Sequence, residues 1–200
     1  MIEILILYYS RHGSTESLAR EICQGVDSVK GASAKLRTVP KVSSVCESME
    51  DEIPKDGPAY IDKKDLHNCS GLILGSPTHF GNMAAELKYF FDSTSNEWLN
   101  NVLSGKPAGL FTSSKSQHGG QETTLLTMAI PLIHHGMLIT GVPYSTKELS
   151  TTSGGGTPYG PSHVSSSDSN KGLTEDEILI ARKLGKRIAS IALKLNPNHL

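Results

Sequence analysis

The sequence contains few cysteines, and their spacing excludes several kinds of site. They are Cys23, Cys46 and Cys69 in a chain of 200 residues. An odd number without C-x-x-C spacing argues against a disulfide framework and against a zinc ribbon. No arginine stands six positions after any of them, as the C-x5-R loop of a small phosphatase requires. We interpret the three cysteines as small packed thiols in a reducing compartment.

The sequence also lacks an excess of charge of either sign and any long apolar run. Its formal net charge is −1, which indicates neither a nucleic acid partner nor an anionic membrane. Its first residues show no basic stretch followed by an apolar region, so no signal peptide is predicted. No apolar run approaches the length that spans a bilayer. We therefore expect a cytoplasmic protein with no membrane insertion.

Apolar runs that alternate with amphipathic stretches predict the secondary structure. Leu18, Ile22 and Val26 recur every four residues, as on the buried face of a helix. Ser14 or Thr15 is placed to cap the N-terminus of that helix. We predict strands over residues 2–9, 34–39, 71–75, 108–111 and 137–142. We predict helices over residues 15–26, 84–94, 121–135 and 174–195.

This alternation indicates the fold class. Five strands alternating with helices predict an α/β fold, a doubly wound five-stranded parallel sheet with helices on both faces. Pro131 should kink its helix or mark the last turn, because proline removes an internal hydrogen bond. Thr174 and Glu177 have the spacing of a capping box, which predicts where the last helix begins.

The length is compatible with a single domain over residues 1–200. Two polar segments interrupt the alternation of strands and helices. Residues 41–64 are rich in Ser, Glu, Asp and Lys, and we interpret them as an irregular excursion. Residues 145–172 are rich in Ser, Thr and Gly and predict a long loop insertion. A loop of this length is usually functional or mobile, and a disordered surface loop is the alternative.

Ligands bind such sheets at the carboxyl ends of the strands, so the loops after the first, third and fourth strands are candidate sites. The first loop, residues 10–15, lies between a buried strand and a helix N-terminus. Free N–H groups, hydroxyls and the helix dipole there form an anion site that fits a phosphate monoester. The loop is neither a Walker A loop nor a G-x-G-x-x-G turn, and an ordinary helix cap is the alternative. Its residues are Ser10, Arg11, His12, Gly13, Ser14 and Thr15.

The second loop, residues 75–83, has the composition of a site for a flat heteroaromatic ring. Glycine and proline constrain its backbone, while an alcohol, an aromatic ring and an amide lie close together. The alternatives are that His79 is a surface residue and that Phe80 is a core anchor. The candidate binding residues are Pro77, Thr78, His79, Phe80, Gly81 and Asn82.

The third loop, residues 113–120, runs from the fourth strand into a helix. Its small residues let the backbone approach a ligand closely. Its N–H groups could hold the carbonyls of a ring and stabilise negative charge on it after reduction. A flexible solvent loop is the alternative. The candidate binding residues are Ser113, Ser114, Lys115, Ser116, Gln117, His118 and Gly119.

Four stretches of the sequence carry a family resemblance: residues 75–83, 117–124, 134–137 and 155–160. With them, the chain resembles the tryptophan-repressor-binding-protein (WrbA) family of flavodoxin-like NAD(P)H:quinone oxidoreductases. The likeness runs from about residue 4 to residue 195. It implies a flavodoxin-like fold, bound FMN, NADH or NADPH as co-substrate, and assembly into a homotetramer. It also implies a quinone substrate, reduced by two electrons to a hydroquinone.

The resemblance also implies roles for individual residues. The first loop would hold the FMN phosphate, and the second and third loops would hold the flavin ring. His134 would be the catalytic flavin-site histidine, and Trp98 would lie on the substrate side. No metal is expected. The family often has Tyr at the position of His12 and Arg at that of His79, and a small residue is usual in place of Lys115. These differences bear on cofactor preference and FMN affinity.

Other readings of the same residues stay open. A flavodoxin-type single-electron carrier and a regulatory interaction protein are the alternative functions, although carriers are typically strongly acidic and this chain is nearly neutral. Trp98 could serve packing, and His134 and His135 could interact with the dipole of the helix that ends there.

Overall fold

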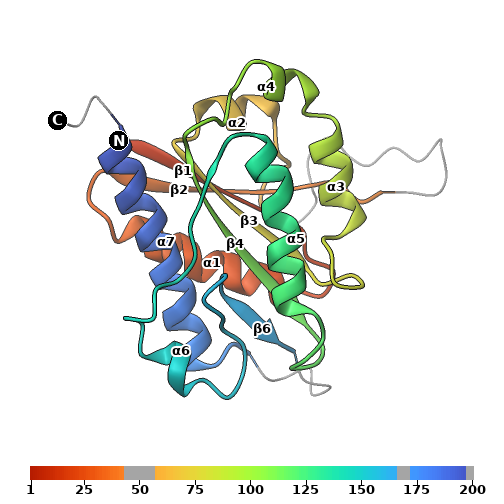
Figure 1. Ribbon diagram of the computed structural model, residues 1–200, viewed down its shortest axis with the longest axis vertical. Coiled ribbons are helices and arrows are strands. Elements are labelled where there is room, and N and C mark those ends of the chain that lie inside the picture. The colour runs from red at the N-terminus through yellow and green to blue at the C-terminus, as the bar shows by residue number, and fades with distance from the viewer. Residues whose placement is uncertain (43–56, 166–171, 197–200) are drawn as a thin grey trace.

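The computed structural model describes residues 1–42, 57–165 and 172–196 (Figure 1). The strands are β1 (Ile2–Tyr8), β2 (Ala32–Thr38), β3 (Gly71–Pro77), β4 (Pro107–Ser114), β5 (Leu138–Ile139) and β6 (Ser162–Val164). The helices are α1 (Ser14–Asp27), α2 (Lys63–Asn68), α3 (Ala85–Asp92), α4 (Ser95–Leu99), α5 (Gln121–His134), α6 (Glu148–Thr151) and α7 (Glu175–Leu195).

The strands form a parallel sheet in the order β2-β1-β3-β4-β5, which confirms the predicted doubly wound α/β fold. The fifth position is shared by two short strands. β5 pairs with the start of β4 at Pro107 and Ala108, and β6 pairs with its end at 112–114. The chain therefore leaves the sheet after Thr140 and returns at Ser162. The segment 145–172, predicted as one long loop, contains α6 and β6 within its described part.

Helices cover both faces of the sheet, and each face has its own core (Figure 1). The odd residues Leu5 and Leu7 of β1 pack with α3 and α5, whereas the even residues Ile4 and Ile6 pack with α1 and α7. All four side chains are fully buried. A central parallel strand buried on both faces therefore reads as a continuous apolar run, which explains why β1 could be predicted.

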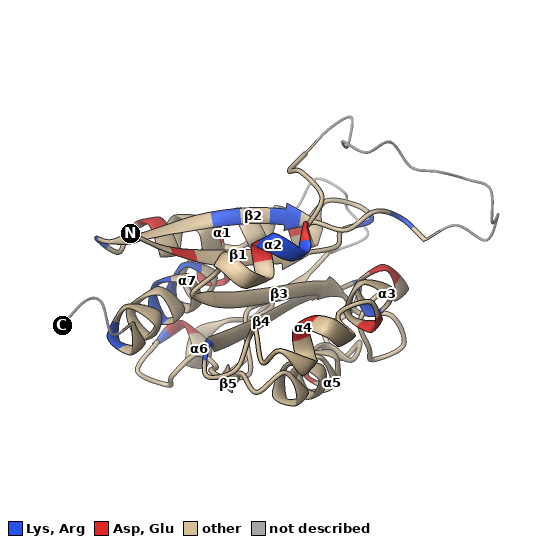
Figure 2. Ribbon diagram, turned by 90° about the horizontal axis from the view of Figure 1, so that it is seen from above, with Lys and Arg blue, Asp and Glu red and all other residues tan. Residues whose placement is uncertain are grey.

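Strand β2 lies at the edge of the sheet, and charged residues protect that edge. Asp65 of α2 forms ion pairs with Lys35 and Arg37 of β2, each at 2.8 Å. Figure 2 shows these basic positions on β2 with α2 beside them. Charged side chains on an edge strand discourage pairing with another chain.

Several local predictions are confirmed. Thr174 and Glu177 form a complete capping box at the start of α7, and Pro131 lies in the last turn of α5. Burial raises the pKa of Cys23 and of Cys69 to about 11, so both thiols stay protonated near neutral pH, as expected for packed cysteines. Cys46 lies outside the described residues.

Candidate functional site

The three predicted loops meet at the carboxyl edge of the sheet, because β1, β3 and β4 are neighbours in it. Ser113 joins all three. Its hydroxyl shares a buried hydrogen bond of 2.8 Å with the hydroxyl of Thr15, and its carbonyl accepts a hydrogen bond of 2.8 Å from the N–H of Thr78. Strand order reverses between β1 and β3, and such a switch point is where doubly wound sheets bind ligands.

The first loop presents the N-terminus of α1 without a side-chain cap. Gly13 is the N-cap residue, with a left-handed φ of 88°, and its N–H donates to Ser10 Oγ at 3.0 Å. The prediction that Ser14 or Thr15 caps this helix is therefore wrong, because Thr15 is buried and bonds Ser113 instead. An anion at this end would meet both the dipole and the first-turn N–H groups. In this loop Ser10 and Ser14 are half-buried, and Arg11 and His12 are exposed.

The second loop is a tight turn that displays Phe80. His79 N–H donates to Asn82 O at 2.8 Å, and Asn82 N–H donates to His79 O at 3.1 Å. Both central residues have positive φ, 53° at Phe80 and 76° at Gly81. The ring of Phe80 is fully exposed, so the alternative that it anchors the core is wrong. A bulky residue in a left-handed conformation is strained, and such strain is concentrated at functional sites.

The other candidates of the second loop line the same turn. The hydroxyls of Thr78 and of Thr124 in α5 are 2.7 Å apart, which joins the loop to that helix. Asn82 is exposed, and its side-chain oxygen accepts from the N–H of Met83 at 2.8 Å. Pro77, Thr78, His79 and Gly81 are half-buried.

The third loop leads to a second helix without a side-chain cap. Gly120 is the N-cap residue of α5, with a φ of 89°. A Cβ at this position would lie 3.3 Å from the Cα of Gly81, so the glycine lets the second and third loops approach closely. Ser113 and Ser114 are buried and Gly119 is half-buried, whereas Lys115, Ser116, Gln117 and His118 are exposed.

The two longer helices that begin at the site share the same kind of N-terminus. Both α1 and α5 begin at a left-handed glycine and have no side-chain cap at the carboxyl edge. Helices α2 and α7 begin with complete capping boxes, whereas α3, α4 and α6 also lack a side-chain cap but begin at a residue other than a left-handed glycine. The free positive ends of α1 and α5 therefore fit a ligand that carries a phosphate and hydrogen-bond acceptors. The exposed Phe80 ring supplies an apolar surface for a flat group at the same edge.

Tyr9 and Glu86 add a contact that the sequence did not indicate. Tyr9 follows β1 and is buried. Burial first, and then the interaction with the carboxylate of Glu86 in α3, raise the pKa of Tyr9 to about 12. Tyr9 therefore keeps its proton at neutral pH and links the first loop to the helix that follows the second. No local pattern could have revealed this pair, because only the topology brings the two residues together.

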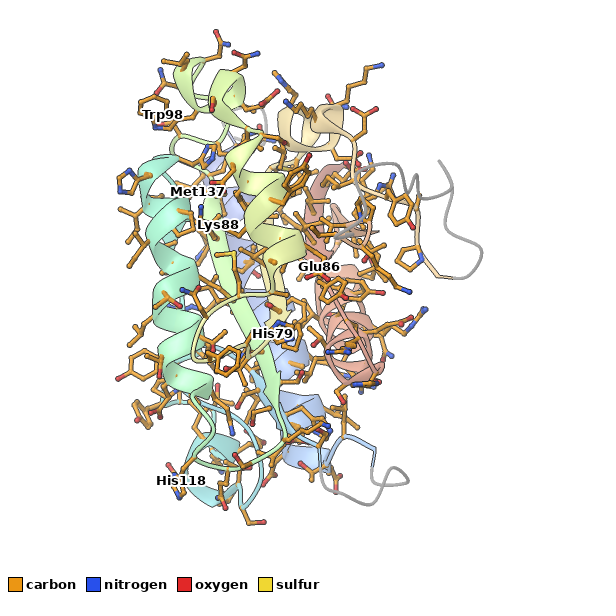
Figure 3. The ribbon with its side chains drawn as sticks, turned by 90° about the vertical axis from the view of Figure 1, so that its right-hand side faces the viewer. His79, Glu86, Lys88, Trp98, His118 and Met137 are labelled. Carbon is orange, nitrogen blue, oxygen red and sulfur yellow. The ribbon has the colours of Figure 1, made fainter. Side chains whose placement is uncertain are left out.

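Two predicted site residues lie elsewhere. His134 ends α5, and its carbonyl accepts a hydrogen bond of 2.8 Å from Trp98 Nε1 of α4. Helix α5 begins at the third loop and runs back along the sheet, so its 14 residues place His134 roughly 21 Å from that loop. Figure 3 shows Trp98 and His118 at opposite ends of the molecule. Within one chain, therefore, His134 and Trp98 do not join the three loops.

The described part of the chain contains no group of three or more His, Cys, Asp or Glu side chains arranged to hold a metal ion. None of its helices is long and apolar enough to cross a membrane.

Sequence comparison links this chain to flavin enzymes. Residues 2–148 match the family model described as NADPH-dependent FMN reductase. A curated relative from Chromohalobacter salexigens, named NAD(P)H dehydrogenase (quinone), is 39% identical over 199 residues. That alignment covers 98% of this chain and 99% of the relative.

Comparison with solved structures supports the fold. A WrbA-like flavodoxin protein from Agrobacterium tumefaciens matches with a TM-score of 0.71 at 22% identity, covering 98% of this chain and all of that one. Oxidised flavodoxin 2 from Bacillus cereus matches with a TM-score of 0.60 at 19% identity, covering 94% of this chain and 99% of that one. The sheet is therefore flavodoxin-like.

Proposed function

The chain belongs to the NADPH-dependent FMN reductase family, and from this premise we propose that it is an FMN-dependent NAD(P)H:quinone oxidoreductase. One observation carries the proposal: three loops meet at the switch point of a flavodoxin-like sheet, with two helix N-termini that have no side-chain cap. The relative named NAD(P)H dehydrogenase (quinone), aligned over nearly the whole chain, supplies the reaction class.

The residues present fit FMN. When bound, FMN accepts a hydride from NADH or NADPH and passes two electrons to a quinone. The first loop and the N-terminus of α1 would hold the phosphate, because they offer N–H groups, a hydroxyl at Ser10 and the helix dipole. The second and third loops would hold the ring, with Phe80 against one face and backbone N–H groups at its edge. Arg11 and His12 are exposed beside the phosphate position.

We propose a homotetramer to explain the position of His134 and Trp98. Both are exposed at the edge of the sheet opposite the loops, so a role at the flavin requires a neighbouring copy of the chain. Helix α5 offers a surface for such a copy. Leu126, Ile130 and Ile133 lie on one side of this helix, and each is at least half exposed. An apolar stripe of this kind on a soluble protein marks an interaction site.

In this arrangement, His134 of one copy would hydrogen-bond the flavin of another or help to supply protons, and Trp98 would lie on the substrate side.

The proposed location of the protein is the cytoplasm.

Anaerobic visible spectroscopy tests the function. FMN is added to the purified protein, then NADPH, then benzoquinone. We expect the flavin bands to bleach with NADPH and to return with quinone. Bound flavin that NADPH and NADH both leave oxidised would instead indicate a single-electron carrier, and a stable semiquinone during titration would point the same way. Absence of bound flavin would contradict the proposal outright.

A further inference from the structure

We propose that Gln121 is a positioning residue that holds the third loop in its ligand-binding shape, and that a buried Glu177–His163 pair anchors the other end of this support. The inference rests on the proposed function, because it assigns the third loop to the flavin ring. None of these three residues belongs to the loops that would contact the ligand.

Both the nitrogen and the oxygen of the Gln121 side-chain amide form hydrogen bonds. This residue begins α5 and is buried. Its Nε2 donates to Gln117 O at 2.9 Å and to Ser116 O at 3.3 Å. Its Oε1 accepts from Ser162 Oγ of β6 at 2.6 Å. The amide therefore has one orientation, since a flip would face its oxygen toward two carbonyls.

The carbonyls held by Gln121 determine where the next N–H groups point. No described peptide bond is cis, and in a trans peptide the carbonyl and the following N–H point in opposite directions. Because the carbonyls of Ser116 and Gln117 point toward Gln121, the N–H groups of Gln117 and His118 point away from it. These are donors of the kind that would bind ring carbonyls and stabilise negative charge on a reduced flavin.

Ser162 connects Gln121 to the loop insertion at residues 145–172. While its hydroxyl donates to Gln121, it accepts from the N–H of Gly156 at 2.8 Å. The N–H of Gly155 donates to Glu177 Oε1 at 2.8 Å. A Cβ on Gly155 would lie 2.0 Å from the carbonyl oxygen of Ser162 and 2.7 Å from Glu177 Oε1. Only glycine therefore fits between the strand and the carboxylate.

Glu177 anchors this end of the support. It is almost completely buried, and four groups bond its carboxylate. Besides Gly155, they are the N–H of Thr174 at 2.8 Å, the N–H of Val164 at 3.3 Å and His163 Nδ1 at 2.9 Å. Burial, the largest effect, raises the pKa of Glu177, but His163 and then the N–H groups of Thr174 and Gly155 together bring it below its usual value. The charged carboxylate thus fixes β6 and the glycine turn relative to α7, and Gln121 transmits that position to the loop.

Two variants test the role of Gln121. Gln121→Leu keeps the size of the side chain but removes its hydrogen bonds, and Ser162→Ala removes only the hydroxyl between Gln121 and Gly156. Glu122→Asp is the matched control, because Glu122 is the next residue of α5, is exposed, and keeps its charge in this variant. For each protein we would measure the dissociation constants of oxidised and reduced FMN, the midpoint potential of the bound flavin and the thermal unfolding temperature.

We expect Gln121→Leu to weaken the binding of reduced FMN about tenfold more than that of oxidised FMN. The reason is that the N–H groups that this variant displaces would otherwise stabilise the negative charge of the reduced ring. Such a difference lowers the two-electron midpoint potential by about 30 mV. Ser162→Ala should give a smaller shift in the same direction, and the control none. A structural defect alone would lower the unfolding temperature without changing the ratio of the two dissociation constants.

The outcomes separate this inference from the proposed function. Wild-type protein that binds FMN, together with an unchanged ratio in both variants, would overturn the role of Gln121 and leave the oxidoreductase standing. Wild-type protein that binds no FMN would overturn the proposed function and this inference with it. If Gln121→Leu does not fold, Ser162→Ala decides, since it removes a single oxygen atom.

Discussion

At the scale of single residues, the backbone of Phe80 is informative because its tight turn requires a positive φ at a position where glycine would avoid strain. Its φ of 53° favours glycine, yet the residue is a phenylalanine with its ring in solvent. Asn101 has a similar φ of 54° but lies beyond α4, at the edge of the sheet opposite the loops. The two residues therefore allow the effect of strain to be separated from the effect of the ring.

Phe80→Gly should increase the free energy of unfolding by about 1 kcal/mol, because glycine adopts positive φ without strain. It should also weaken FMN binding about tenfold through loss of the aromatic contact. Asn101→Gly should give a smaller gain in stability, because asparagine tolerates positive φ better than phenylalanine, and it should leave FMN binding unchanged. Urea unfolding and fluorescence titration would measure the two quantities. A large loss of stability in Phe80→Gly would show that the ring packs against the protein.

His135 is a buried histidine whose protonation state follows from its hydrogen bonds. The hydroxyl of Thr94 donates to Phe91 O at 2.7 Å, so it accepts from His135 Nε2 at 3.0 Å. The neutral ring therefore carries its hydrogen on Nε2, and Nδ1 is buried without a partner among the described residues. Burial lowers the pKa of His135 below 6.5, and the neighbouring Glu97 opposes that effect.

This lowered pKa makes stability depend on pH. The unfolded chain protonates His135 near pH 6.5, before the folded chain does, so the free energy of unfolding should fall as the pH decreases below 6.5. The slope for one proton is at most about 1.4 kcal/mol per pH unit. Urea unfolding between pH 7.5 and about 5.5 would measure it, above the range in which Glu177 titrates. His135→Gln should reduce the slope, and His67→Gln, at an exposed position, should leave it unchanged. Equal slopes in the wild type and His135→Gln would contradict this assignment.

At the scale of elements, the sequence predicted those with strong periodicity. Strand β1 is apolar on both faces, and α7 has both a capping box and a regular apolar stripe. The missed elements have no such signal. Strand β6 has three residues, two of them Ser162 and His163, and is held by pairing with β4 rather than by its own pattern. Helices α2, α4 and α6 have four to six residues, too few for a period to appear.

The candidate site was predictable only in part, for the same reason. Its three loops follow buried strands, so the strand order implied that they would meet. The separation of His134 from them could not be read from residue types, because it depends on the direction in which α5 runs. The missing cap of α1 was also hidden, since Thr15 suits a cap by composition but bonds Ser113 across the sheet.

Helices α1 and α7 pack closely against each other at Gly25 and Gly185. This contact gives a prediction at the scale of elements. A Cβ at Gly25 would lie 2.1 Å from the carbonyl oxygen of Arg182, so Gly25→Ala should force the helices apart. We expect a loss of about 1–3 kcal/mol of stability. Gly172→Ala is the control, because nothing lies within 4 Å of its Cβ position. Thermal unfolding of both variants would decide, and equal unfolding temperatures would show that the helices adjust freely.

At the scale of the whole molecule, a substitution on the apolar side of α5 tests the proposed homotetramer. Ile130 is 54% exposed in the single chain, and in the proposed homotetramer it would be buried between copies. Ile130→Lys should therefore dissociate the assembly, because it places an unpaired charge in that interface. Light scattering coupled to size exclusion measures the mass. Leu179→Lys, at an exposed position of α7, should leave the mass unchanged. A monomeric wild type would contradict the proposed tetramer.

The central claim is that the first loop and the uncapped N-terminus of α1 hold the phosphate of FMN, and a comparison of FMN with riboflavin tests it most directly. The two flavins share the ring and differ by the phosphate. Titration of the flavin-free protein, followed by flavin fluorescence, should give a dissociation constant at least about 100-fold lower for FMN, or about 2.7 kcal/mol, the contribution of one or two charge-assisted hydrogen bonds. Equal affinity for the two flavins would contradict the claim.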